Sequence, residues 1–235
     1  MTGTTPKWLD LGATNAWKMF DDKTNTQTVN SGDIEVVIEP GRINTIACLN
    51  IEASTVTVTM VSGVETVYTD TRNRQAAVSS HWYQYFFEPI TRDHNAIFAD
   101  LPIYGEAVTT VTIDNVTSDA ECGTFVAGFY KELGTSLWGA TAGVLDYSVK
   151  STDDFGNTTL LKRNNSKTLD IDLFVKPNQI NETYKTLRDN IAEIRLWIGS
   201  EDYDPTIIYG FMREFSEIIS SPAGTNLSLT LEGLI

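Results

Sequence analysis

The chain has 235 residues, of which 41% are hydrophobic, so it can bury a sizeable core and is too apolar to be disordered. Its 31 acidic residues outnumber 17 lysines and arginines, which gives a formal net charge of -14. This charge argues against binding to a nucleic-acid backbone, because the densest basic cluster is only Lys162, Arg163 and Lys167.

The beginning of the chain carries no apolar core of the kind found in signal peptides. No window approaches the roughly 18 uncharged apolar residues that a membrane-spanning helix needs. We therefore expect a protein that is made in a cytoplasm, does not insert into a membrane and binds no nucleic acid.

Short apolar stretches separated by turn signals follow from residue 32 onward. The expected strands are 34–38, 45–51, 55–60, 64–69, 82–87, 96–98, 108–113 and 124–130. Ser62-Gly63 is typical of a hairpin turn, and the many β-branched residues favour strands over helices. Eight short strands at this spacing predict a mainly β fold that begins with a jelly-roll-like β-sandwich domain over residues 1–133.

The two cysteines, Cys48 and Cys122, lie far apart within apolar strand patterns. A disulfide would require those strands to be neighbours, whereas buried thiols suit a domain of this size better. Neither cysteine belongs to a CxxC pair, which argues against a zinc site built on thiolates.

Residues 134–143 are small, glycine-rich and nearly uncharged, as is typical of a linker between two domains. Beyond this linker we expect a smaller β module over residues 144–235. Its expected strands are 144–150, 158–162, 167–175, 191–198, 206–213 and 226–232, and the first two flank a turn at 153–157.

One helix is predicted in this module, at about residues 177–190. Pro177 suits a first helical turn, and the apolar residues at helical spacing are Ile180, Tyr184, Leu187, Ile191 and Ile194. Because the last two continue the stripe, the helix can also extend past Asn190. Its apolar face is expected to pack on the C-terminal sheet.

Motifs that resemble reactive sites are better explained by structure. Asp154-Phe155-Gly156 matches the magnesium-binding tripeptide of kinases, but no glycine-rich loop precedes it and it lies between two expected strands like a turn. His81 and His94 are expected at the surface. No catalytic residue is expected.

Two acidic groups are candidates for calcium sites. Asp170 and Asp172 share one face of a strand, and residues 201–204 form an acidic loop, but neither has the spacing of an EF-hand loop. We expect solvated charges, no metal site and no cofactor. A metal held by side chains from distant strands would leave no such signal.

The aromatic stretch 82–87 is the strongest candidate for binding. On a strand, Trp82, Gln84 and Phe86 face one side, and Tyr83, Tyr85 and Phe87 face the other. One face belongs to the core, and the other either packs against a neighbouring subunit or stacks on a sugar. The candidate glycan-stacking residues are Trp82, Tyr83 and Tyr85.

Several short segments resemble structural proteins of tailed bacteriophages. They are Thr14 to Asp21, Pro40-Gly41 with Ile43-Asn44, Trp82 to Phe87, Asp146-Tyr147-Ser148, Asp153 to Gly156, Trp197-Ile198-Gly199, Ile208 to Phe211 and Leu231 to Ile235. The resemblance implies a tail or baseplate component of distal-tail or tail-tube type, in which a β module with one helix forms rings and a carbohydrate-binding-like sandwich decorates them.

From the residues and this resemblance together we expect a non-enzymatic virion structural protein of the phage tail, made in the cytoplasm of the bacterial host. Its expected partners are copies of itself in a ring and other virion tail proteins. The alternative is a carbohydrate-binding module that attaches the virion to host glycans. A glycan hydrolase is least supported, since no paired-carboxylate motif stands out.

Overall fold

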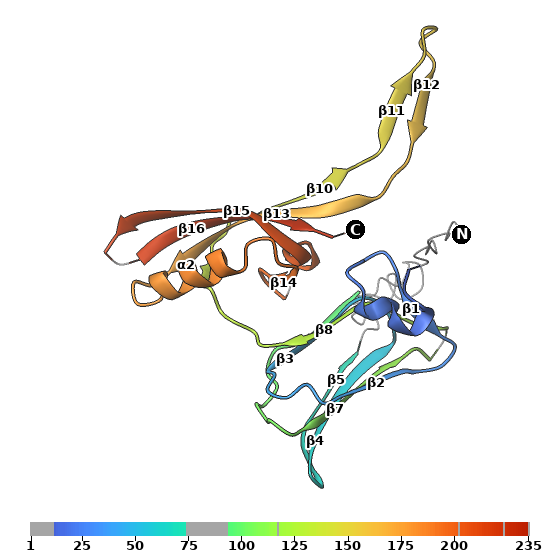
Figure 1. Ribbon diagram of the computed structural model, residues 1–235, viewed down its shortest axis with the longest axis vertical. Helices are drawn as coiled ribbons and strands as arrows, with labels where there is room; N and C mark the ends of the chain where they lie inside the picture. Colours follow the sequence, from blue (N-terminus) through green and yellow to red (C-terminus); the bar gives the residue numbers. More distant parts are fainter. Residues whose placement is uncertain (1–11, 74–93, 117, 202, 223, 235) are drawn as a thin grey trace, which may run out of the picture.

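The computed structural model describes residues 12–73, 94–116, 118–201, 203–222 and 224–234. It shows two β-rich lobes joined by one crossing of the chain, and a long β-hairpin that projects away from both lobes (Figure 1). The fold is mainly β, as the sequence predicts. No helix in these residues has the length and apolar character to cross a membrane.

The N-terminal lobe is a sandwich of two four-stranded antiparallel sheets. Its strands are β1 (Thr28–Asn30), β2 (Ile34–Ile38), β3 (Thr45–Glu52), β4 (Thr55–Ser62), β5 (Glu65–Asn73), β6 (Asn95–Phe98), β7 (Val108–Asp114) and β8 (Ala120–Gly128). The inner sheet, which faces the second lobe, has the order β1-β8-β3-β6, and the outer sheet has the order β2-β7-β4-β5. This alternation of strands between two sheets is the jelly-roll topology, so the predicted sandwich is confirmed.

Alternating side chains explain why these segments form half-buried strands. In β4, Val56, Val58 and Met60 are fully buried between the two sheets, while the intervening threonines point outward. Thr57 lies opposite Thr71 on one side and Thr112 on the other, so the solvent face of the outer sheet is rich in threonine. The β-branched side chains fit this pleated surface well.

Both cysteines are buried thiols. Cys48 of β3 lies opposite Phe125 of β8, and Cys122 of β8 lies opposite Ile51 of β3. The two cysteines are therefore on neighbouring strands but not opposite each other. They fill the sandwich core as small apolar side chains, which agrees with the interpretation favoured from the sequence.

The C-terminal lobe is built on another antiparallel sheet of order β10-β13-β16-β15-β14, with β9 also paired to β13. Its elements are β9 (Thr135–Ser136), β10 (Thr141–Asp146), β11 (Val149–Thr152), β12 (Thr158–Leu161), β13 (Asn165–Val175), α2 (Ile180–Asp189), β14 (Arg195–Ile198), the 3-10 turn η2 (Asp204–Thr206), β15 (Ile207–Ser221) and β16 (Gly224–Gly233). A further 3-10 helix, η1 (Asn15–Phe20), precedes the sandwich and is additional to the predicted elements.

The expected linker 134–143 is largely structured. Thr135–Ser136 and the beginning of β10 both pair with β13, while the chain crosses between the lobes at residues 129–134. The small, uncharged residues of this segment are compatible with a linker and equally with an exposed strand at the edge of a sheet.

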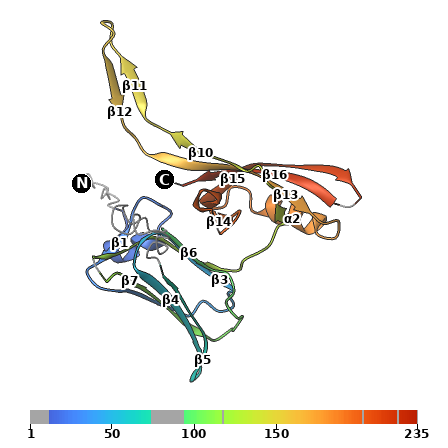
Figure 2. The same ribbon diagram turned by 180° about the vertical axis from the view of Figure 1, so that it is seen from behind.

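The helix α2 covers one face of the C-terminal sheet (Figure 2). Leu187 is fully buried, and it belongs to the same core cluster as the sheet residues Ile171, Leu173 and Leu229. Ile191 and Ile194 do not continue this helix, since it ends at Asp189 and Ala192 adopts a left-handed φ of 61°. The possible extension past Asn190 is therefore wrong.

The two lobes contact each other through a small apolar cluster. Ala47, Leu49 and Ile97 on the outward face of the inner sheet pack with Ile207 of β15. Thr24 also donates a hydrogen bond to the carbonyl oxygen of Leu234 at 3.0 Å. These contacts hold the edge of the C-terminal sheet against the sandwich.

Candidate functional site

The predicted glycan-stacking residues, Trp82, Tyr83 and Tyr85, lie outside the described residues, as does His81. His94 is exposed, as expected, and its Nδ1 lies 3.5 Å from Glu52 Oε1. The remaining sequence candidates fall in separate parts of the molecule.

The acidic candidates take part in surface hydrogen bonding. Thr230 donates to Asp170 at 2.8 Å, and Ser228 donates to Asp172 across the β13–β16 pair. Asp204 pairs with Lys167, with 3.0 Å between Oδ2 and Nζ. Within the ranges described above, no group of three or more histidine, cysteine or carboxylate side chains is placed to hold a metal ion.

The first unusual feature is the projecting hairpin, which we call the arm (residues 141–165). Its lower part is β10, which pairs with the beginning of β13, and its upper part is the two-stranded β11–β12 pair. Tyr147 anchors the lower part, since its hydroxyl donates to Glu232 of β16 at 2.8 Å. Every residue of the arm is exposed except Ser148, which is partly buried, so the upper part packs against neither lobe (Figure 1).

The exposed side chains of the arm include many large hydrophobic ones. They are Val144, Leu145, Tyr147, Val149, Phe155, Leu160 and Leu161. Phe155 at the tip is 91% exposed, and Leu160 is 69% exposed. Single exposed hydrophobic residues are ordinary, but here a series of them lies along one projecting hairpin.

The turn at the tip of the arm is well defined. Asp153 Oδ1 accepts the backbone N–H groups of Phe155 at 3.0 Å and of Asn157 at 2.7 Å. Hydrogen bonds from the Asn157 side chain and backbone lower the pKa of the Asp153 carboxyl. Gly156 supplies a φ of 85°, which L side chains rarely adopt. The Asp-Phe-Gly tripeptide is thus part of a turn, as expected, and the turn presents Phe155 to solvent.

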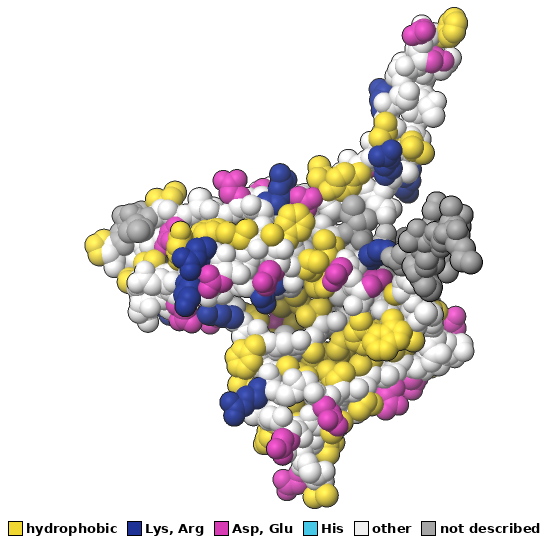
Figure 3. Space-filling view, in the orientation of Figure 1, with side chains coloured by type: hydrophobic (Ala, Val, Ile, Leu, Met, Phe, Trp, Pro, Cys, Tyr) yellow, Lys and Arg dark blue, Asp and Glu magenta, His cyan; other side chains and the backbone are white. Residues whose placement is uncertain are grey.

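The second feature is a cleft between the lobes, with a volume of about 540 Å³. One wall is the outward face of the inner sheet, including Thr45 and Ala47, and the other is α2 with the inner face of the C-terminal sheet. In the space-filling view hydrophobic side chains gather in the hollow between the lobes (Figure 3). The volume is within the range of known ligand sites.

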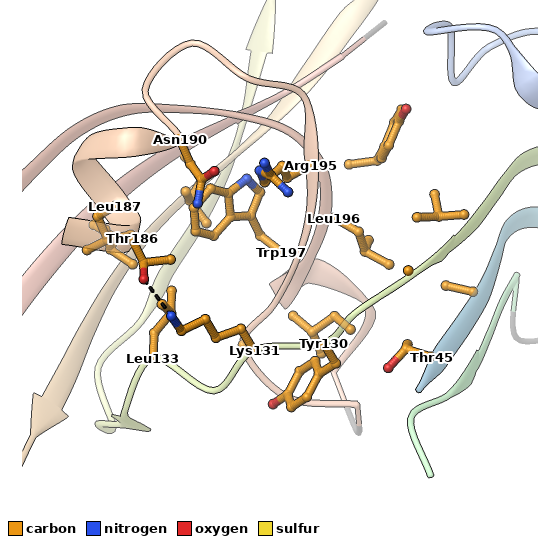
Figure 4. Close-up of a pocket in the computed structure, with 18 of the residues that line it drawn as sticks. Thr45, Tyr130, Lys131, Leu133, Thr186, Leu187, Asn190, Arg195, Leu196 and Trp197 are labelled. Carbon is orange, nitrogen blue, oxygen red and sulfur yellow. Dashed lines mark hydrogen bonds between the residues drawn. The ribbon is translucent and has the colours of Figure 1, made fainter. Parts of the chain in front are cut away.

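Polar groups surround the apolar floor of the cleft. Trp197, which is 9% exposed, donates its indole N–H to the carbonyl oxygen of Gly210 at 3.2 Å. Lys131 lies toward α2, where it donates to Thr186 at 2.8 Å, and Tyr130 lies on the side of Thr45 (Figure 4). Among the described residues that line the cleft, Lys131 and Arg195 are cationic and none is a carboxylate.

The crossing segment is held to the helix at this site. Lys131 Nζ lies 2.9 Å from Glu182 Oε1, and Thr183 donates to the carbonyl oxygen of Leu133 at 3.2 Å. These bonds hold the crossing segment, which lines the cleft, against α2.

The two tyrosines of the cleft remain neutral at physiological pH. Burial raises the pKa of the Tyr130 phenol, with a further contribution from Glu132 and Glu201. Burial likewise raises the pKa of Tyr209, and Asp22 and Asp21 add to this effect. Both phenols are therefore hydrogen-bonding groups rather than anions.

No local sequence signal marks either feature. Leu160 and Leu161 resemble ordinary strand residues, since exposure on a projecting hairpin leaves the local pattern unchanged. The cleft joins residues as distant as Thr45 and Trp197, so only the packing of the two lobes creates it.

The arm and the cleft both offer apolar surface on which another molecule can bind. Comparison of the sequence with models of known protein families finds no match, and comparison with curated proteins finds no similar sequence.

Proposed function

We propose that this chain is a non-enzymatic structural protein that assembles with copies of itself into a ring in the tail or baseplate of a tailed-phage virion. The observation that carries the proposal is the arm, whose upper part exposes its hydrophobic side chains instead of packing them against its own lobes. The phage setting rests on the resemblance of the short segments described above.

An isolated two-stranded hairpin is marginally stable in water, and it becomes stable when a further surface covers it. The β11–β12 pair has only four residue pairs, from Val149 opposite Leu161 to Thr152 opposite Thr158. Neither lobe covers the side chains of this pair, which are exposed to solvent. A neighbouring subunit would supply the missing contacts and bury Leu160 and Leu161.

The charges of the arm suit contact with another acidic copy. Its three cations are Lys150, Lys162 and Arg163, and its three carboxylates are Asp146, Asp153 and Asp154. The arm is therefore neutral, whereas the whole chain carries a net charge of -14. A neutral arm avoids the repulsion that two acidic surfaces would experience on contact.

The arm can join copies in either of two ways. Two copies can exchange arms as a symmetric pair, or each arm can bind the body of the next copy in a heterologous contact, which is the arrangement that the proposed ring requires. Such contacts repeat around an axis, and they produce a closed ring when the rotation closes.

Electron microscopy of the purified full-length chain tests this proposal. We expect closed rings of uniform diameter, which would stack or join other tail proteins in the virion. Dispersed single particles at every protein concentration would contradict the assembly function. Open filaments without closure would contradict the ring.

A further inference from the structure

We infer that the tip of the arm of one copy inserts Phe155 into the interlobe cleft of a second copy. This inference rests on the proposed self-assembly and specifies the surfaces that meet. It commits to a second copy of this chain as the occupant of the cleft.

The tip is shaped for insertion. Phe155 is 91% exposed, and it is presented by a turn that the Asp153 carboxylate closes through two backbone hydrogen bonds. The turn fixes the backbone that presents Phe155, and an aromatic side chain has few torsions to restrict on binding, which is why such residues often dominate interfaces.

The tip cannot fill the cleft of its own chain. The arm leaves the C-terminal sheet and extends away from the sandwich (Figures 1 and 2). The residues that line the cleft belong to the facing sides of the sheet and the sandwich. A contact between tip and cleft therefore has to join two molecules.

The cleft offers what the tip requires. Its lining is largely apolar and includes the partly buried Leu196, Ile198 and Tyr209, and its volume of about 540 Å³ accommodates an aromatic ring together with its neighbours in the turn. Tyr209 supplies an aromatic surface beside Leu196, its partner across the β14–β15 pair, and a phenyl ring can pack on it edge-on or offset.

The charges of the two surfaces are complementary. Asp153 and Asp154 precede Phe155, and the cleft is lined by Lys131 and Arg195 with no carboxylate among the described lining residues. Each cation already has an exposed acidic partner, which is Glu182 for Lys131 and Glu193 for Arg195. An ammonium has three N–H donors and a guanidinium five, so both can bind a second anionic partner.

Disulfide trapping between two variants tests the contact directly. One full-length copy carries Phe155→Cys and the other Ile194→Cys, a cleft-lining position that is 39% exposed. After mixing and mild oxidation we expect a covalent heterodimer as the main product, and the native Cys48 and Cys122 do not compete because both are buried.

Two matched pairs control for random collisions. Thr141→Cys, at the base of the arm, is mixed with Ile194→Cys, and Phe155→Cys is mixed with Val37→Cys on the outer sheet. Both control positions are exposed, so a low yield from these pairs reflects distance from the contact and not poor access.

Charge reversal supplies a second readout. Asp154→Lys is used because Asp153 is needed for the turn, and we expect it to raise the dissociation constant of assembly by about tenfold or more. Arg195→Glu alone should weaken assembly similarly. Combining the two changes should restore at least part of the lost affinity.

The outcomes separate this inference from the proposed function. An assembled wild-type protein whose tip–cleft pair cross-links no more than the control pairs would overturn the inference and leave self-assembly intact. A wild-type protein that stays monomeric would overturn both. Selective cross-linking together with charge-reversal rescue supports both.

Discussion

Gly210 lies where β15 closely approaches β16 in the C-terminal sheet. It pairs with Gly233 of β16, and a Cβ added at Gly210 would overlap the backbone carbonyl of Glu232. Backbone atoms cannot move aside as a flexible side chain can, so this position requires glycine for space rather than for its φ angle.

We therefore expect Gly210→Ala to lower the free energy of unfolding by about 1–3 kcal/mol. The measurement is chemical denaturation of the purified variant. Gly128→Ala is the matched control, since a Cβ at Gly128 meets nothing within 4 Å. Equal stabilities of the two variants would contradict the close approach of β15 and β16.

The tip of the arm should respond to acid through Asp153. Hydrogen bonds from Asn157 lower the pKa of this carboxyl below the 3.8 of an ordinary aspartate. A lowered pKa means that the carboxylate stabilises the turn fully above about pH 3.8, and that this contribution is lost as the pH falls through the lowered value.

An NMR titration of the Asp153 side-chain carboxyl measures this pKa. We expect a midpoint below 3.8 in the wild-type protein and a shift toward 3.8 in Asn157→Ala, which removes the side-chain donor. A wild-type midpoint at or above 3.8 would show that the turn does not hold the carboxylate as described.

At the scale of elements, the packing of α2 depends on Leu187 more than on the rest of its apolar stripe. Leu187 is fully buried, whereas Tyr184 is 45% exposed and Ile191, beyond the helix, is 54% exposed. We expect Leu187→Ala to lower the unfolding free energy by about 2–5 kcal/mol. Ile191→Ala should change it by about 0.5 kcal/mol or less.

Thermal or urea unfolding of both variants gives the comparison. A small effect of Leu187→Ala would contradict the packing of α2 on the sheet. A large effect of Ile191→Ala would instead support the helical stripe that the sequence suggests beyond Asn190.

Replacing apolar side chains of the arm with polar ones should weaken assembly without lowering the stability of the two lobes. We expect the double change Leu160→Ser and Leu161→Ser to leave the unfolding of the lobes unchanged, since both side chains are exposed and belong to neither core. Assembly should weaken by about tenfold or more, because two hydrophobic contacts between copies are lost.

Analytical ultracentrifugation over a concentration series measures this effect. Thr158→Ser with Thr159→Ser is the matched control on the same strand. If the leucine variant assembles as well as this control, the arm is not the contact surface.

Much of the fold at this scale is predictable from sequence. β2 and the cores of β4 and β13 follow from alternation of buried and exposed residues, and Leu187 follows from helical spacing. Ile191 and Ile194 mislead the prediction because their spacing persists across a turn in which Ala192 leaves the helical region. Periodicity reports side-chain spacing and not the backbone break.

The candidate site is less predictable because it arises from tertiary structure. The strands 144–150 and 158–162 are expected to flank a turn, but nothing local distinguishes a hairpin that packs from one that projects. Likewise Thr45, Tyr130 and Trp197 meet at the cleft only because the lobes dock. The aromatic stretch 82–87 lies outside the described residues, so its role stays a prediction.

At the scale of the whole molecule, the chain divides its tasks between three parts. The jelly-roll sandwich and the C-terminal sheet each bury their own core, with Phe98 and Leu169 among the fully buried side chains. The arm adds apolar surface without a core. This division is understandable if stability is supplied within each copy and the arm contributes contacts between copies.

The molar mass of the purified full-length chain in solution tests the central claim most directly. Light scattering over a range of concentrations should give a fixed multiple of the 26.0 kDa of a single chain, with the arm buried between copies. A mass of 26.0 kDa at every concentration would contradict self-assembly, because the hydrophobic arm would then remain exposed in a stable monomer.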